Sequence, residues 1–320
     1  MPIANAFDAY LSLANDLFEG ALSEDGLPAA TAELSPLNTH LLADLAKYAQ
    51  GFASTKPRYG WAITQVVHTA AISQNCDLSI RSLAAWHLGR ACNHWTQPKR
   101  MSQAIAYARR GFEELNDLGW VAACDWQINA LAWTRPNFAE AAQTLQKALN
   151  QLERAGLTEF LSECRLALAY AQILIGEHEA ALENIRAAEE TYIARGDRLN
   201  QARCWLTQAG SLRRQDRFHE TQIILEQALA VFEQENATTD QARARYQMAL
   251  GYLLQVENLA HAIDQFSKAA GFFASIDLDL WYAMCINNLG SVYLFTGELT
   301  LADKYYGEAR DIFIQHEISG

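Results

Sequence analysis

Residues 287–313 read NNLGSVYLFTGELTLADKYYGEARDIF and contain the pattern that decides the fold. Starting from Ala302, apolar residues follow at offsets 4, 7 and 11, where Tyr306, Ala309 and Phe313 stand. These offsets lie on one face of an α-helix. Small and large residues alternate along that face, so the pattern predicts a helix that packs closely against its neighbours.

The same pattern recurs along most of the chain at a nearly constant interval. Six small residues occupy the position of Ala302, and successive ones are 37, 40, 40, 41 and 40 residues apart. They are Ala104, Ala141, Ala181, Thr221, Ala262 and Ala302. Self-similarity at a fixed period is the signature of a repeat architecture.

Each repeat contains another helix upstream of this one, marked by a step from a larger residue to Gly or Ala. Gly89 and Gly290 mark two of the steps, and Gly210 follows Ala209 at the same place in another repeat. A glycine inside a helix costs about 1 kcal/mol relative to alanine, so its recurrence predicts tight packing at the step. Short connectors such as residues 297–298 separate the two helices. Each repeat is therefore predicted to be a helical hairpin.

The pattern resembles the tetratricopeptide repeat, in which a Leu-Gly step in the first helix precedes an Ala, aromatic, Ala pattern in the second. Trp205, Leu206 and Gly210 show the first part, and the quoted stretch shows both parts. The resemblance covers residues 37–317. The period near 40 is longer than the standard one, and the proline expected at the end of the second helix is missing. The longer unit is similar to those of kinesin light chains and of bacterial regulators, including arrays joined to caspase-like CHAT-domain proteases and signalling ATPases.

Together these features predict an all-α fold, an α-α superhelix (a tetratricopeptide-like solenoid) of about seven helical hairpins. We expect an N-terminal helix and loop over residues 1–36, followed by a repeat array over residues 37–320. The hairpins are expected at residues 37–77, 78–119, 120–156, 157–196, 197–236, 237–277 and 278–317.

Composition argues against some classes of partner. The chain has 25 Lys and Arg residues against 37 Asp and Glu, a net charge of −12, so a general affinity for nucleic acid or anionic lipid is not expected. Residues 59–76 and 280–297 carry no charged side chain, but Gln and Asn interrupt them, so we expect buried helices and no membrane interaction. The first basic residue is Lys47, and no export signal is recognisable. We therefore predict a cytoplasmic protein.

The sequence contains no H-E-x-x-H, G-x-S-x-G, P-loop or dinucleotide-binding motif, so we expect no enzymatic activity, no cofactor and no metal site. Four cysteines each stand 17 residues before the small residue that marks their repeat, one of Ala141, Ala181, Thr221 and Ala302. They are predicted to be small, reduced core residues. They are Cys124, Cys164, Cys204 and Cys285. Three histidines begin second helices and are predicted to be exposed turn residues. They are His178, His219 and His261.

Two basic clusters stand out. Residues 78–112 contain six basic and no acidic side chains: Arg81, Arg90, Lys99, Arg100, Arg109 and Arg110. They form either a docking patch for an acidic or phosphorylated partner, or a solvated face partly neutralised by the acidic N-terminal segment, and the second interpretation is favoured. Arg213, Arg214 and Arg217 surround Asp216 at a hairpin turn, where a solvated surface is the expected role.

In helical arrays of this kind the first helices line a concave groove, so partner contacts are expected there. Counting from the small-residue steps places fourteen residues in the groove: Trp86, Arg90, Asn93, His94, Gln127, Asn129, Arg135, Thr207, Ser211, Arg214, Tyr252, Gln255, Asn287 and Ser291. Asparagine amides suit recognition of a peptide backbone. Asn129 and the Asn287-Asn288 pair match the first-helix asparagines of the kinesin light chain type, and internal hydrogen bonding is an equal alternative for Asn288.

The leading functional hypothesis is a non-catalytic scaffold that binds a peptide or protein segment in the groove. The alternative is the N-terminal sensor or regulatory part of a larger bacterial signalling enzyme, a CHAT protease or a signalling ATPase. The last helix carries further apolar residues, Leu301, Tyr305, Ile312 and Ile314, so end-to-end self-association through it is possible if the chain is not a fragment of a longer protein.

Overall fold

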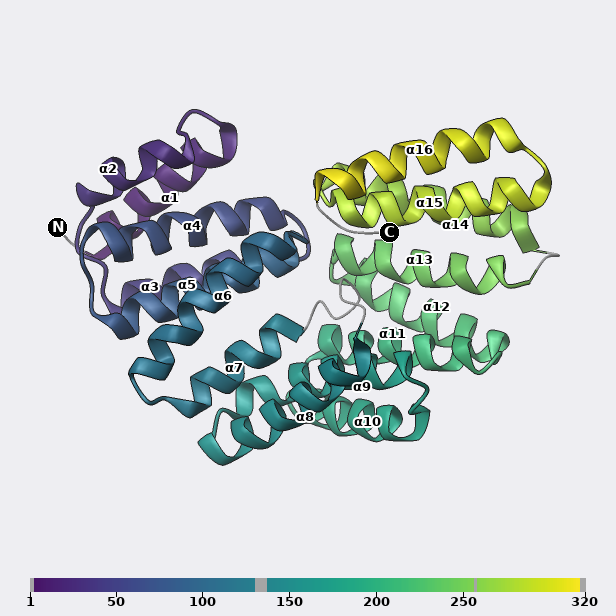
Figure 1. Cartoon of the computed structure of the whole chain (residues 1–320), viewed down its shortest axis with the longest axis horizontal. Helices are drawn as coiled ribbons and strands as arrows, with labels where there is room; N and C mark the ends of the chain where they lie inside the picture. Colours follow the sequence, from purple (N-terminus) through teal and green to yellow (C-terminus); the bar gives the residue numbers. More distant parts are fainter. Residues whose placement is uncertain (1–2, 130–136, 256–257, 317–320) are drawn as a thin grey trace. The chain divides into compact units, whose positions relative to one another are not determined.

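The computed structural model describes residues 3–129, 137–255 and 258–316, and all regular structure in these ranges is helical (Figure 1). Two compact units can be distinguished. Unit 1 comprises the described residues up to 129 together with 154–156, and unit 2 comprises the remaining ones from 137 onwards. The predicted all-α class is confirmed. The division into an N-terminal segment and one array over residues 37–320 stays a prediction.

Unit 1 contains seven α-helices and one short 3-10 turn (Glu24–Gly26) among its described residues. The helices are α1 (Ile3–Glu19), α2 (Leu27–Ala32), α3 (Thr39–Gln50), α4 (Pro57–Ser73), α5 (Leu78–His94), α6 (Pro98–Glu114) and α7 (Leu118–Asn129). Helix α3 packs on α4 and α5 on α6, as the hairpin prediction requires, while α1 and α2 pack on α4.

Unit 2 contains the later hairpins. Its helices are α8 (Phe138–Ala155), α9 (Leu161–Leu174), α10 (His178–Ala194), α11 (Arg198–Arg214), α12 (Phe218–Gln234), α13 (Thr238–Leu253), α14 (Leu259–Ser275), α15 (Asp279–Thr296) and α16 (Leu299–Gln315), with a 3-10 turn at Thr158–Phe160. Helices α9 and α10, α11 and α12, α13 and α14, and α15 and α16 form four successive hairpins. The first helices also contact each other, α9 with α11 and α11 with α13.

The predicted packing face is observed in the second helices. Ala181, Thr221 and Ala262 are fully buried, and so are the large residues Phe232 and Phe273 further along the same face. Single residues with positive φ close many of the turns between helices, and most are Asn, Asp or Gly, which adopt this conformation most readily. The helix ends are therefore fixed by local sequence, and the stacking is fixed by the repeated small and large residues.

The glycine steps differ from each other in a way the sequence did not reveal. A Cβ atom added to Gly89 would lie 2.3 Å from Cδ1 of Ile105, so α5 and α6 meet closely there, as predicted. At Gly210 an added Cβ would meet no atom within 4 Å, and the prediction of tight packing is wrong at this residue. The adjacent Ala209 is the fully buried residue, so the small packing residue stands one position earlier in α11.

None of the described helices combines the length and the hydropathy needed to cross a bilayer.

Candidate functional site

The residues predicted to line a groove in unit 1 surround a cluster of aromatic rings. Trp86 is only 1% exposed and belongs to the core. The guanidinium of Arg90 lies 5.2 Å from the ring centre of Trp86 and 5.8 Å from that of Trp126, which are cation–π distances. Asn93 and His94 are half-buried at the end of α5. Trp86 therefore supports this surface from inside, and Arg90 covers the rings.

On α7 the expected groove residues lie inside the fold. Gln127 is 2% exposed, and Asn129 is 8% exposed and donates a hydrogen bond from Nδ2 to the Asp125 carbonyl at 2.8 Å. Both side chains therefore have little surface for a partner. Arg135 lies outside the described residues.

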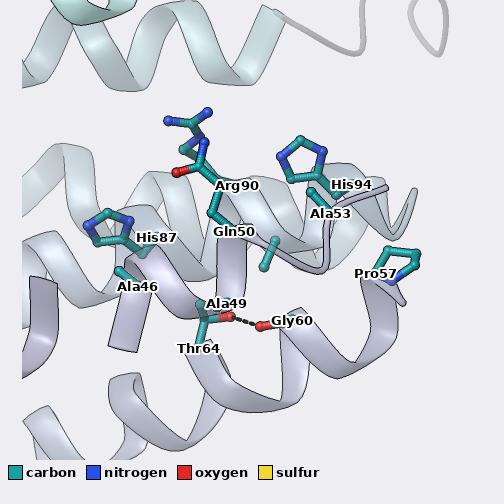
Figure 2. Close-up of a pocket in the computed structure, with 11 residues that line it drawn as sticks. Ala46, Ala49, Gln50, Ala53, Pro57, Gly60, Thr64, His87, Arg90 and His94 are labelled. Carbon is teal, nitrogen blue, oxygen red and sulfur yellow. Dashed lines mark hydrogen bonds between the residues drawn. The ribbon is translucent and has the colours of Figure 1, made fainter. Parts of the chain in front are cut away.

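A small cavity in unit 1 lies beside Arg90 and His94 (Figure 2). Its volume is about 30 Å³, and α3, the following turn, α4 and α5 supply its walls. The lining residues are Ala46, Ala49, Gln50, Ala53, Pro57, Gly60, Thr64, His87, Arg90, Ala91 and His94. Burial, and secondly the positive charge of Arg90, lower the pKa of His87 to about 3, so this imidazole is neutral at pH 7. A cavity of this size accommodates a water molecule and is far below the volume of ordinary ligand pockets.

Two of the six basic residues in the first cluster are paired with acidic side chains. Arg100 forms two hydrogen bonds of 2.9 Å to the Glu24 carboxylate, which comes from the acidic N-terminal segment. Arg109 pairs with Asp125 at 2.7 Å and also with Glu113.

In unit 2 the expected groove residues divide between surface and interior. Ser211 is fully buried, and its hydroxyl lies 3.1 Å from Nδ1 of His178. His178 is therefore half-buried and hydrogen-bonded, and the expectation of an exposed turn histidine is wrong for it. The remaining residues are half-buried, except for Arg214, which is exposed. They are Thr207, Arg214, Tyr252, Gln255, Asn287 and Ser291.

Some of these half-buried side chains have bonds within their own helices. Thr207 donates to the Arg203 carbonyl at 3.0 Å, and Gln255 donates to the Gly251 carbonyl at 3.1 Å. Ser291 accepts a 3.0 Å hydrogen bond from Tyr306 of the neighbouring helix α16.

The structure shows a set of side chains on successive first helices, and counting from the small steps identifies only Thr207, Arg214 and Asn287 of them. We call it the first-helix face of unit 2, and it consists of Tyr170 on α9, Arg203, Thr207, Arg213 and Arg214 on α11, Arg243, Tyr246 and Gln247 on α13, and Asn287 and Asn288 on α15. Nε of Arg203 bonds both carboxylate oxygens of Asp240 at 3.2 Å, and its Nη2 bonds one of them at 2.7 Å. Asn288 donates to the Tyr246 hydroxyl at 3.2 Å. These bonds tie α11 to α13 and α13 to α15.

The repeat period contained a signal for this face. Arg203 and Arg243 are 40 residues apart, and Thr207, Gln247 and Asn288 follow at intervals of 40 and 41. Residues separated by one period occupy equivalent places on successive first helices. Comparing the chain with itself at this spacing would have identified the face.

The buried cysteines match their prediction. Cys124, Cys164, Cys204 and Cys285 are free and fully buried. Burial raises the pKa of Cys164 and Cys204 to about 12, so both are thiols at pH 7. No group of three or more His, Cys, Asp or Glu side chains arranged to hold a metal ion occurs among the described residues.

Comparison with known proteins supports the fold. Neither protein-family models nor curated proteins match the sequence. Among solved structures, the Rap conjugation gene regulator of the plasmid pLS20, in complex with the Phr* peptide, is 12% identical with a TM-score of 0.64, over 87% of this chain and 73% of that one. A Rap protein complexed with competence and sporulation factor is 13% identical with a TM-score of 0.59, over 98% of both chains. The apo form of the quorum sensor NprR from B. thuringiensis is 13% identical with a TM-score of 0.51, over 97% of this chain and 98% of that one. The chain therefore has a tetratricopeptide-type helical solenoid fold.

Proposed function

We propose that this protein is a non-catalytic scaffold that binds a peptide or an extended protein segment on the first-helix face of unit 2. The observation that carries the proposal is Gln247: its Oε1 atom is buried and has no hydrogen-bond partner among the described residues. A buried amide oxygen without a partner costs about 1–3 kcal/mol. Gln247 as a whole is half-buried, so a rotation of its side chain would present this oxygen to a backbone N–H of a bound peptide.

The neighbouring amides have the same capacity. The Nδ2 group of Asn288 donates hydrogen bonds to the Tyr246 hydroxyl and to the Met284 carbonyl. These two bonds fix the orientation of the amide and leave its oxygen as an acceptor for a ligand. Asn287 is half-buried beside it. Amides at equivalent places on successive helices present donors and acceptors at intervals, which suits an extended backbone.

The solved structures of similar fold agree with this proposal, since one of them holds the Phr* peptide. The alternative role, as the regulatory part of a larger signalling enzyme, stays a prediction, and so do end-to-end association through α16 and a cytoplasmic location.

The test is a selection of peptides from a random dodecapeptide phage library on the full chain. We expect enrichment of related sequences. Binding of the enriched peptides should fall at least tenfold in the triple variant Gln247→Ala, Asn287→Ala, Asn288→Ala. The matched control changes two exposed amides on a second helix, Gln146→Ala and Asn150→Ala, and should leave binding unchanged. Enrichment of unrelated sequences, or equal binding by the triple variant with its helicity intact, would refute the proposal.

A further inference from the structure

Four arginines stand on the first-helix face of unit 2, and two of them share one carboxylate. Asp240, which is 2% exposed, bonds Arg203 and lies 3.6 Å from Nη1 of Arg243. One carboxylate therefore serves two guanidinium groups. The Arg243 side chain remains 41% exposed, and its guanidinium carbon lies 5.6 Å from the ring centre of Trp281.

Arg213 and Arg214 have no ion-pair partner among the described residues. Nε of Arg213 is buried and makes no hydrogen bond there. Burial, followed by the charge of Arg214, lowers the pKa of Arg213. By contrast, Arg217, which the sequence groups with them, is bound to the Glu220 carboxylate by hydrogen bonds of 2.7 and 2.6 Å. The sequence cluster at this turn therefore contains one arginine paired with an acid and two without an acidic partner among the described residues.

The surroundings of these arginines contain few acids and two tyrosines. Burial raises the pKa of Tyr170, and the charges of Arg214, Arg243 and Arg213 all oppose that rise, so the three guanidinium groups lie within electrostatic range of its phenol. The charge of Glu163 also acts on Arg203 and raises the pKa of its guanidinium.

The helix surface beside the arginines is open. Gly210 lies one turn before Arg213 and Arg214 on α11, and an added Cβ there would meet no atom within 4 Å. A ligand backbone can therefore approach the helix closely at this point.

An apolar line continues from the arginines across the next two helices. Leu254 stands 40 residues after Arg214, and Phe295 stands 41 residues after Leu254, so the three occupy equivalent places at the ends of α11, α13 and α15. Leu254 is 55% exposed, Phe295 is 70% exposed, and Leu294 beside it is 51% exposed. Exposed large apolar residues in a row indicate an interaction surface.

We infer that the first-helix face of unit 2 binds an acidic peptide whose carboxylates are held by Arg213, Arg214 and Arg243 and whose apolar side chains contact Leu254 and Phe295. This inference rests on the proposed function and specifies its ligand chemistry. Guanidinium groups bind carboxylates through paired hydrogen bonds. A long polyanion such as nucleic acid does not fit, because the chain as a whole carries a net charge of −12.

The spacing expected of packed helices predicts the spacing of apolar residues in the ligand. Adjacent packed helices lie about 10 Å apart, and an extended peptide advances about 3.3 Å per residue. Large apolar residues are therefore expected about three and six positions from the acidic residue.

The experiment analyses the composition of peptides selected from the random dodecapeptide library on the full chain and on the variant Arg213→Gln, Arg214→Gln. We expect Asp and Glu to be enriched on the wild-type chain and not on the variant. The enriched peptide is then synthesised with a fluorescent label, and its anisotropy is measured with single variants. Replacing its Glu or Asp by Gln or Asn should weaken binding at least tenfold, and so should Arg214→Gln. Because Arg214 is exposed, this variant retains the fold. Arg217→Gln is the matched control and should bind as the wild type does, and added NaCl should weaken binding.

The outcomes distinguish failure of the acidic-ligand inference from failure of the proposed peptide binding. Enriched peptides that lack acidic residues, or an affinity that Arg214→Gln does not change, would overturn the acidic ligand and leave peptide binding intact. A phosphoserine version that binds more tightly than the carboxylate version would overturn it in favour of a phosphate site. A library that yields no enrichment on either chain would overturn both proposals.

Discussion

Alanine at Gly89 and at Gly210 should change stability in different ways, although both glycines mark the small step of a first helix. Each substitution gains about 1 kcal/mol of helix propensity. At Gly210 the new Cβ meets no atom within 4 Å, so this gain remains. At Gly89 the new Cβ would lie 2.3 and 2.5 Å from Cδ1 and Cγ1 of Ile105.

The cost at Gly89 follows from these distances. Carbon atoms pack best about 3.5–4.0 Å apart, so Ile105 must move by more than 1 Å, and it is fully buried. Overpacking of this kind costs about 1–3 kcal/mol. The two variants should therefore differ by about 1–3 kcal/mol in the free energy of unfolding, with Gly210→Ala the more stable.

The assay is urea denaturation followed by circular dichroism, with hydrogen exchange assigning each change to α5 or α11. The double variant Gly89→Ala, Ile105→Ala supplies a second check. Removing the clashing atoms should make the loss in the double variant at least 1 kcal/mol smaller than the sum of the single losses, on the order expected for residues in contact. Equal stabilisation by both glycine substitutions, or strict additivity in the cycle, would show that the close approach at Gly89 has been misread.

Three further outcomes are expected. Asp240→Asn should lower the free energy of unfolding by about 2–3 kcal/mol, because the buried carboxylate of Asp240 pairs with two partly exposed arginines, Arg203 and Arg243, and an unchanged urea midpoint would contradict this. Burial lowers the pKa of His68 to about 4 and that of His87 to about 3, below the usual value near 6.5 in an unfolded chain. As the pH drops from 6.5 towards 4, protons bind these histidines in the unfolded chain first, so the free energy of unfolding should fall. In the variant His68→Gln, His87→Gln, the urea midpoint should fall less steeply over this pH range. A thiol reagent should modify half-buried Cys76 first in the native protein and the five buried cysteines only on unfolding, as mass spectrometry of the labelled peptides would reveal.

The helical hairpins were predictable because their determinants repeat in the sequence. A residue such as Ala181 or Phe232 has a recognisable place on a helix face, and six copies of the pattern reinforce each other. The turn residues are also local signals, as at Gly176 and Gly196, which have positive φ. Packing of this type depends on periodicity, which a single sequence displays directly.

The candidate site was harder to predict. Which face of a first helix points away from the core depends on which of its two adjacent small residues is buried. In α5 the tightly packed residue is Gly89, whereas in α11 it is Ala209 rather than Gly210. Successive residues of a helix are rotated by about 100°. Counting from the wrong member of a pair therefore rotates the predicted face, and Ser211 was placed in the groove although it is fully buried.

Pairing of charges was equally hidden in the sequence. Arg213 and Arg217 stand in one basic cluster around Asp216, yet only Arg217 is bound to Glu220. The difference arises because Arg213 lies within α11, whereas Arg217 and Glu220 stand together at the start of α12. The residue types in a basic cluster therefore do not show which arginine lacks an acidic partner and can bind a ligand.

In each hairpin, the residues proposed to bind a ligand differ from those that pack in the core. Side chains proposed to meet a ligand lie on the exposed side of the first helices, as Arg214 and Phe295 do, whereas fully buried residues such as Ala228 and Phe266 hold unit 2 together. Substitutions that retarget the molecule to a new sequence therefore need not touch the residues that hold it together. An architecture divided in this way allows the exposed positions of the first helices to change while the buried packing stays the same.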